Sequence, residues 1–267
     1  MTTEIQITSG AKATLYPVKE SSKYVIYFHG GGFVYGSRHD IPQALIEVFH
    51  HANLNVIALD YLLAPNTALE NIITTATQDC LELITQTIKE QPFIFCGRSA
   101  GSYLMQAVTK CLNAQKESIP KALINFYGYS DLDNIDQKRE LVPQKITPDM
   151  IKTFDLTTTV WDDPTLQRSL LYYYAVQEQL LSDYYQVKNN EKAFKLSKED
   201  ILNLPPTFGS ASSTDAEVPF YYSKALKRSP QDKFVAVYDL EHDFLKETTN
   251  PQVIKVFTQL AKWLESL

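Results

Sequence analysis

The feature that most constrains the fold is a Gly-x-Ser-x-Gly motif at residues 97–101, which directly follows an apolar run at residues 93–96. Apolar residues then recur at helical spacing, at positions 104, 107, 108, 111 and 112. Together they predict a strand, a tight turn and a helix. Because Gly97 and Gly101 lack a Cβ, the helix can pass close to the strand, and Ser99 can project its hydroxyl above the sheet edge. We therefore predict that Ser99 is a nucleophile, with the unpaired N–H groups of the new helix beside it.

A second motif, with three consecutive glycines, lies at residues 29–33 and ends an apolar run at residues 24–28. Three glycines leave the backbone free to turn its N–H groups toward a ligand, as in loops that stabilise a developing oxyanion. Glycine-rich loops also bind dinucleotides, and Asp60 ends the next predicted strand, near where a ribose-binding acid would lie. That interpretation requires Gly-x-Gly-x-x-Gly from Gly30, but position 35 is Tyr35. We therefore disfavour a dinucleotide site.

The base and the acid that a serine nucleophile needs are predicted near the end of the chain. Of the five histidines, only His242 follows both the serine and a candidate acid, on a loop after the last predicted strand. Its imidazole is suited to take the proton of Ser99 and return it to a leaving group. Asp215, after the penultimate strand, is expected to orient His242. A helix N-cap is the alternative role for Asp215, and Asp131 is the reserve candidate for the acid.

The remaining chain alternates strand-like and helix-like segments, which predicts the α/β class with a mostly parallel central sheet flanked by helices. The last helix should begin with Asn250 as its cap and Pro251 at its first position. The expected strands are residues 4–7, 13–16, 24–28, 55–61, 93–96, 122–127, 206–212 and 234–240, and the other expected helices cover residues 41–52, 73–88 and 104–112.

One long segment, residues 133–203, interrupts this pattern before the last two strands. It contains no glycine, is rich in tyrosine and ends in a charged run. At roughly 70 residues it is too long for a plain loop. We expect a helical cap there, inserted into the α/β core of residues 1–132 and 204–267. Its tyrosines could line an acyl pocket or pack the cap onto the core, and the sequence leaves both open.

Charge and composition exclude some partners. A net charge of −6 disfavours nucleic acid and anionic membranes as the main partner. No apolar run approaches the ~20 residues that span a bilayer, and no signal peptide is visible. The three cysteines lack metal-site spacing, which indicates free thiols and no metal site. We therefore expect a cytoplasmic location, and the sequence leaves open whether the chain forms a homo-oligomer.

Taken together, the motifs at residues 29–33, 60–65, 97–101, 215–219 and 242–244 resemble the α/β-hydrolase superfamily, in particular the esterase/lipase branch related to hormone-sensitive lipase. The order nucleophile, acid, histidine is that of this superfamily. The resemblance implies hydrolysis of a small-molecule carboxylic ester through an acyl-enzyme on Ser99, without a cofactor. It also implies an oxyanion hole formed by the N–H groups of Gly31, Gly32 and Ala100. From the same motifs we assign His29, Phe33 and Arg98 to substrate binding.

The sequence departs from that branch at several positions, and these leave the substrate open. Arg98 stands where an acidic residue is usual, Ser102 where a glycine is usual, and Leu62 where an arginine is usual. The N-terminal cap of the branch is largely absent. Two alternatives therefore stay open: an amidase, such as an arylformamidase, or a peptidase with the same triad, and a non-catalytic small-molecule-binding protein. Ester against amide turnover, and labelling by a fluorophosphonate, would separate them.

Overall fold

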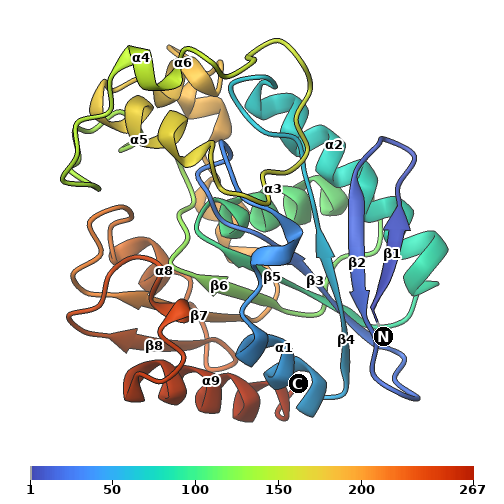
Figure 1. Ribbon diagram of the computed structural model, residues 1–267. Coiled ribbons are helices and arrows are strands. Elements are labelled where there is room, and N and C mark those ends of the chain that lie inside the picture. The colour runs from blue at the N-terminus through green and yellow to red at the C-terminus, as the bar shows by residue number, and fades with distance from the viewer. Residues whose placement is uncertain (1) are drawn as a thin grey trace.

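A twisted sheet of eight strands runs through the protein in the computed structural model, which describes residues 2–267 (Figure 1). The strand order is β1-β2-β4-β3-β5-β6-β7-β8. The pairs β1/β2 and β2/β4 are antiparallel and all other pairs are parallel. This confirms the predicted α/β class with a mostly parallel sheet. The strands are β1 Thr3–Gln6, β2 Lys12–Tyr16, β3 Lys23–Phe28, β4 Leu54–Leu59, β5 Phe93–Arg98, β6 Leu123–Phe126, β7 Thr207–Ser212 and β8 Lys233–Val237.

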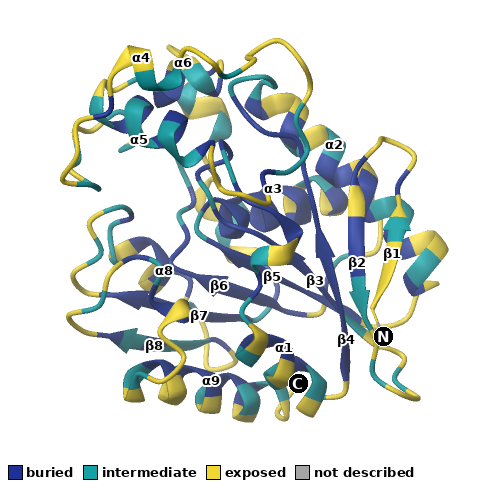
Figure 2. Cartoon of the chain, viewed as in Figure 1, coloured by how far each residue is buried: buried dark blue, intermediate teal, exposed yellow. Residues whose placement is uncertain are grey.

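The central strands are buried on both faces, as their continuous apolar sequences require. Every residue of β4, β5 and β6 is buried (Figure 2). In the register of the sheet, Gly97 of β5 lies opposite Phe28 of β3 and opposite Asn125 of β6. The carboxyl ends of these parallel strands therefore meet at one edge, where the glycine loop and Ser99 begin.

Two pairs of helices cover the two faces of the sheet. Helices α1 (Gln43–His51) and α9 (Pro251–Leu264) pack on one face, and α2 (Leu69–Glu82) and α3 (Ala100–Gln115) on the other. In α9 the apolar residues recur every three or four positions, so that one stripe faces the sheet. The Asn250 side chain accepts a hydrogen bond from the N–H of Gln252 and Pro251 is the first helical residue, which confirms the predicted start. A π-helical turn, Leu83–Ile88, continues α2.

Residues 133–203 contain less helix than predicted. Their longest helix is α5 (Ser169–Gln177), and residues 152–168 form turns and loops. Side chains hold this irregular backbone in place of a helical ladder: Arg168 donates hydrogen bonds to the carbonyl oxygens of Val34 and Ala64. The short helices α4 and α6 lie beside α5, above the sheet in Figure 1. The other elements of the segment are α4 Pro148–Ile151, α6 Leu181–Tyr184, the 3-10 turn Glu191–Phe194 and α7 Lys198–Leu202.

Within residues 2–267, none of the helices combines the length and the apolar character needed to cross a bilayer.

Candidate active site

Ser99 lies in the sharp turn between β5 and α3, with φ 50° and ψ −121°. A positive φ is a strained conformation for a residue with a side chain. A Cβ at Gly97 would collide with the backbone of Gly101 and Ser102, and a Cβ at Gly101 would collide with the carbonyl of His29. Both glycines are therefore required for the close approach of helix and strand that exposes the Ser99 hydroxyl at the sheet edge.

The structure brings Ser99, His242 and Asp215 into one hydrogen-bonded chain. His242 Nε2 lies 2.8 Å from Ser99 Oγ, and His242 Nδ1 lies 2.6 Å from Asp215 Oδ2. The imidazole is buried and packs edge-to-face on Tyr127, with ring centroids 4.8 Å apart. In this geometry one imidazole nitrogen can accept the serine proton while the other donates to the carboxylate.

Asp215 uses its second oxygen to hold its own loop. Its Oδ1 accepts hydrogen bonds from the N–H groups of Glu217 and Val218, at 2.8 and 2.9 Å. The next helix, α8 (Tyr221–Ala225), begins six residues later, so the carboxylate does not cap a helix. The reserve candidate Asp131 is engaged elsewhere, with the hydroxyl of Tyr222 and the ammonium of Lys195.

The pKa of His242 is raised to about 9 by its surroundings. Burial by itself lowers this pKa, because it disfavours the charged imidazolium. The negative charges of Glu217, Asp215 and Asp243 outweigh burial. In the free protein, the imidazole is therefore mostly protonated at neutral pH.

Three backbone N–H groups in the glycine loop and directly after Ser99 lack an acceptor among residues 2–267. Within the described residues, the N–H groups of Gly31, Gly32 and Ala100 donate to no protein acceptor. Gly31 and Gly32 both have positive φ, and a Cβ on Gly32 would collide with the ring of Tyr172. Ala100 is the first residue of α3, where the N–H lacks an intrahelical partner. Such unpaired donors can hold a negatively charged oxygen.

The structure buries the side chains of His29 and Phe33, and neither lines a cavity at Ser99, although both were predicted to bind substrate. His29 is fully buried, stacked on Tyr61 at 4.1 Å, with Nδ1 2.7 Å from the carbonyl oxygen of Gly30. Phe33 is fully buried and packs against Tyr61, Tyr103 and Tyr185. Both side chains support the glycine loop from behind instead of lining the cavity in front of it.

Arg98, the third residue assigned to substrate binding, reaches the cavity wall but is neutralised there. It is 2% exposed, and its guanidinium pairs with Asp40 at 2.6 Å and with Asp243 at 3.2 Å. The hydroxyl of Tyr127 donates to Asp243 at 2.8 Å. Asp40, Tyr127 and Asp243 were not predicted as residues of the site. Arg98 itself could have indicated the two carboxylates, because a cation at the end of a buried strand requires negatively charged partners.

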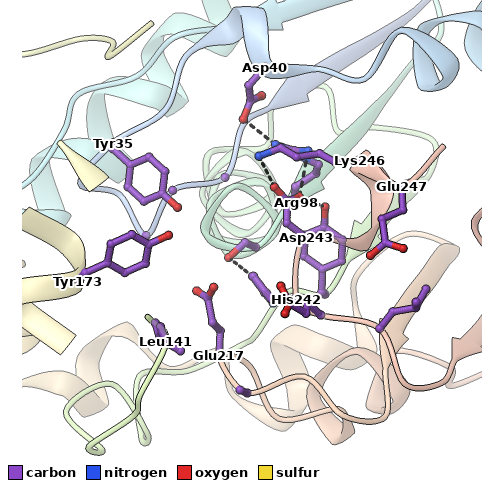
Figure 3. Close-up of a pocket in the computed structure, with 18 of the residues that line it drawn as sticks. Tyr35, Asp40, Arg98, Leu141, Tyr173, Glu217, His242, Asp243, Lys246 and Glu247 are labelled. Carbon is purple, nitrogen blue, oxygen red and sulfur yellow. Dashed lines mark hydrogen bonds and ion pairs between the residues drawn. The ribbon is translucent and has the colours of Figure 1, made fainter. Parts of the chain in front are cut away.

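Two cavities of unequal size meet at Ser99. The larger, about 770 Å³, is lined by the glycine loop, by Tyr35 and Tyr173 and by many carboxylates (Figure 3). The smaller, about 50 Å³, lies between Gly32 and residues of the 133–203 segment such as Tyr172 and Leu181. Among residues 2–267, no group of three or more His, Cys, Asp and Glu side chains is arranged to hold a metal ion.

A family model and a solved structure both indicate the same family. A family model described as "alpha/beta hydrolase fold" matches residues 25–208, a range that includes the glycine loop and Ser99 but ends before Asp215 and His242. The crystal structure of an alpha/beta hydrolase superfamily protein from Enterococcus faecalis is 45% identical, with a TM-score of 0.97, over 100% of this chain and 99% of that chain.

Two more distant proteins carry esterase names. Carboxyl esterase 2 from Tuber melanosporum is 18% identical, with a TM-score of 0.70, over 100% of this chain and 85% of that one, and shares the fold. An esterase from Acinetobacter venetianus is 30% identical over 112 residues, 42% of this chain. That match spans only 37% of the relative's length.

Proposed function

The chain belongs to the α/β-hydrolase fold family, and from this premise we propose that it is a serine hydrolase that cleaves carboxylic esters with small acyl groups. The observation that carries the proposal is the continuous contact from Ser99 Oγ through His242 to Asp215, at 2.8 and 2.6 Å. Three side chains from distant parts of the sequence are aligned as a nucleophile, a base and an orienting acid.

In the proposed reaction, His242 Nε2 takes the proton of Ser99 as Oγ bonds to the ester carbonyl carbon. The carbonyl oxygen becomes an oxyanion, held by the N–H groups of Gly31, Gly32 and Ala100. The bond to the alcohol oxygen then breaks, and His242 returns its proton to the departing alcohol. Water repeats the sequence on the acyl-enzyme: His242 takes its proton, and the acid leaves as Ser99 regains its hydrogen.

The sizes of the two cavities support the assignment of the ester's two halves. A cavity of about 50 Å³ has room for an acetyl-sized group, whereas the cavity of about 770 Å³ can take a larger alcohol. Tyr172 and Leu181, which line the small cavity, come from the inserted segment. We therefore also propose that residues 133–203 act as a cap that closes the acyl site on a core of residues 1–132 and 204–267.

The first prediction tests the nucleophile. Because the reaction has no other attacking group, Ser99→Ala should lower kcat toward 4-nitrophenyl acetate by at least ~10⁴-fold. A fluorophosphonate should label the parental protein on Ser99 and leave the variant unlabelled. Ser213→Ala, which removes an exposed hydroxyl near Asp215, is the matched control and should keep both activity and labelling.

Hydrolysis by Ser99→Ala at near the parental rate would refute the mechanism. Turnover of an aryl formamide far above that of the matching aryl ester would favour the amidase alternative. A parental protein that neither reacts with the probe nor hydrolyses either substrate would favour a non-catalytic binding protein.

A further inference from the structure

Glu217 is a half-buried carboxylate beside the proposed catalytic residues. It lines both cavities that meet at Ser99. Its Oε2 accepts one hydrogen bond, from the hydroxyl of Tyr172 at 3.1 Å. Among the residues that the structure describes, no Lys, Arg or His nitrogen lies within 4.0 Å of either carboxylate oxygen of Glu217. The guanidinium of Arg139 lies nearby, but it donates to the backbone carbonyl oxygen of Glu217, at 2.7 Å, and not to the carboxylate. A partly buried carboxylate without a cationic partner is costly, and a cation bound from outside would relieve that cost.

The cations that line the larger cavity are already neutralised. Arg98 pairs with Asp40 and Asp243, and Lys246 pairs with Asp243 at 2.5 Å. Neither therefore balances the charge of Glu217. Four more carboxylates line the rim without an ion pair among the described residues: Glu140, Asp239, Glu241 and Glu247.

Two aromatic side chains face Glu217 across the cavity. Figure 3 shows the hydroxyl ends of Tyr35 and Tyr173 pointing into the same space as the Glu217 carboxylate, with His242 beside that carboxylate. Burial, followed by the negative charge of Glu217, raises the pKa of Tyr35 and of Tyr173, so both phenols stay neutral. Neutral aromatic rings opposite a carboxylate are suited to an alkylammonium ion, which is attracted to both.

We propose that the ester substrate carries a positively charged nitrogen in its alcohol half, and that this nitrogen binds between Glu217 and the rings of Tyr35 and Tyr173. The inference rests on the proposed ester hydrolysis and names the substrate class. The charge belongs to the alcohol half because Tyr35 and Tyr173 line the larger cavity, which the alcohol half is proposed to occupy, and not the smaller one.

Binding of such a cation also changes the proposed base. Among the carboxylates that raise the pKa of His242, Glu217 has the largest effect. A cation beside Glu217 offsets that charge, so the pKa of His242 falls in the complex and the imidazole becomes available at a lower pH. The charged and titratable groups around His242 are Asp215 and Glu217 on the loop after β7, Asp243 on its own loop, Tyr127 after β6, and Arg98 of β5 behind Asp243.

The second prediction uses a pair of esters that differ in charge but not in shape. Acetylcholine and 3,3-dimethylbutyl acetate have the same acyl group, and the latter has carbon in place of the quaternary nitrogen. We expect kcat/KM for acetylcholine to exceed that for the neutral ester by about tenfold or more, a difference of about 1.4 kcal/mol. In Glu217→Gln this ratio should fall to about one.

Glu247→Gln is the matched control, because it removes the same charge from the exposed rim of the cavity. It should keep the ratio within about twofold, since an exposed charge is screened. A loss equal to that in Glu217→Gln would show a diffuse negative field and overturn the assignment to Glu217. A pH series adds a second readout, because kcat/KM reports the pKa of His242 in the free protein and kcat reports it in the complex. For acetylcholine, the rise of kcat with pH should be centred at a lower pH than the rise of kcat/KM. For the neutral ester, the two should be centred at the same pH.

The outcomes separate this inference from the proposed function. Ser99-dependent hydrolysis of 4-nitrophenyl acetate with no preference for acetylcholine would overturn the ammonium site and leave the esterase proposal standing. Absence of hydrolysis of all three esters would instead refute the esterase proposal, and the ammonium site with it.

Discussion

At the scale of single residues, His242 is controlled by carboxylates on two loops. Asp215 contacts it directly, while Glu217 and Asp243 act on it through their charge. The fold therefore stabilises the protonated imidazole, although the proposed mechanism needs the neutral one. Activity on a substrate without a charge should depend strongly on pH.

The third prediction follows from that pKa of about 9. The neutral imidazole is the proposed base, so its fraction grows about tenfold for each pH unit below the pKa and levels off above it. For 3,3-dimethylbutyl acetate we expect kcat/KM to rise from pH 6 to pH 9 and then to level off. Glu217→Gln should move this rise to lower pH, because it removes the largest opposing charge.

Initial rates across this pH range, corrected with Ser99→Ala for spontaneous hydrolysis, would measure the profile. A rise centred at or below the ordinary histidine value of about 6.5 would contradict the role given to the surrounding carboxylates.

Some residues of the candidate site could be predicted from the sequence and others could not. Ser99, His242 and Asp215 were found because each follows a strand that ends at the same sheet edge. Their catalytic roles remain a prediction, although the structure brings them together. The burial of His29 and Phe33 had no such signal, because a motif places a residue near a site without telling which way its side chain points. Glu217 had no signal, because nothing local sets its distance from His242.

At the scale of elements, Arg98 joins three parts of the chain that meet at the site. It lies at the end of β5, directly before Ser99. It pairs with Asp40, which ends the 3-10 turn Arg38–Asp40, and with Asp243, directly after His242. The proposed nucleophile and base therefore sit on segments that one buried guanidinium holds together.

The fourth prediction removes this connection. Arg98→Met leaves Asp40 and Asp243 without their buried partner and should lower the free energy of unfolding by about 3 kcal/mol. It should also lower kcat for 4-nitrophenyl acetate, because the loop of His242 is no longer fixed against the turn of Ser99. Urea unfolding and steady-state kinetics would measure the two effects.

Lys246→Met is the control, since it removes the other cation that contacts Asp243, one that is 55% exposed. It should cost less than about 1 kcal/mol. Equal losses in the two variants would mean that Asp243, and not the link made by Arg98, fixes the loop.

The elements of the core could be predicted from the sequence, but those of the 133–203 segment could not. Core strands such as β5 are continuous apolar runs, and α9 has a regular apolar stripe, so local pattern and tertiary environment agree. In the segment, the absence of glycine and of strand alternation predicts helix. Much of its backbone is instead held by long-range contacts such as those of Arg168 with Val34 and Ala64, which leave no periodic signal.

At the scale of the whole molecule, one buried carboxylate opposes folding at neutral pH. Asp79 of α2 is 1% exposed, and its Oδ2 has no hydrogen-bond partner among the described residues. Burial raises its pKa to about 6, from 3.8. The folded state therefore binds this proton more tightly than the unfolded state, and the stability that Asp79 contributes when protonated is lost as the pH rises from about 4 to about 6.

The fifth prediction compares Asp79→Asn with the parental protein in urea unfolding at pH 5 and pH 7.5. The variant lacks this titration, so its stability relative to the parental protein should be greater at pH 7.5 than at pH 5, by about 1.4 kcal/mol. The sign follows from a folded pKa above the unfolded one. Equal differences at the two pH values would mean that Asp79 titrates normally in the folded protein.

The two cavities at Ser99 differ in size, so the proposed active site distinguishes the two ends of a substrate. The smaller cavity is formed jointly by the core and by residues 133–203, and the larger cavity is formed mostly by loops of the core. An ester is itself directional, because its carbonyl side and its oxygen side differ. We therefore expect two isomeric esters that differ only in the direction of the ester linkage to bind differently, because only one of them places its small group in the smaller cavity and its large group in the larger one.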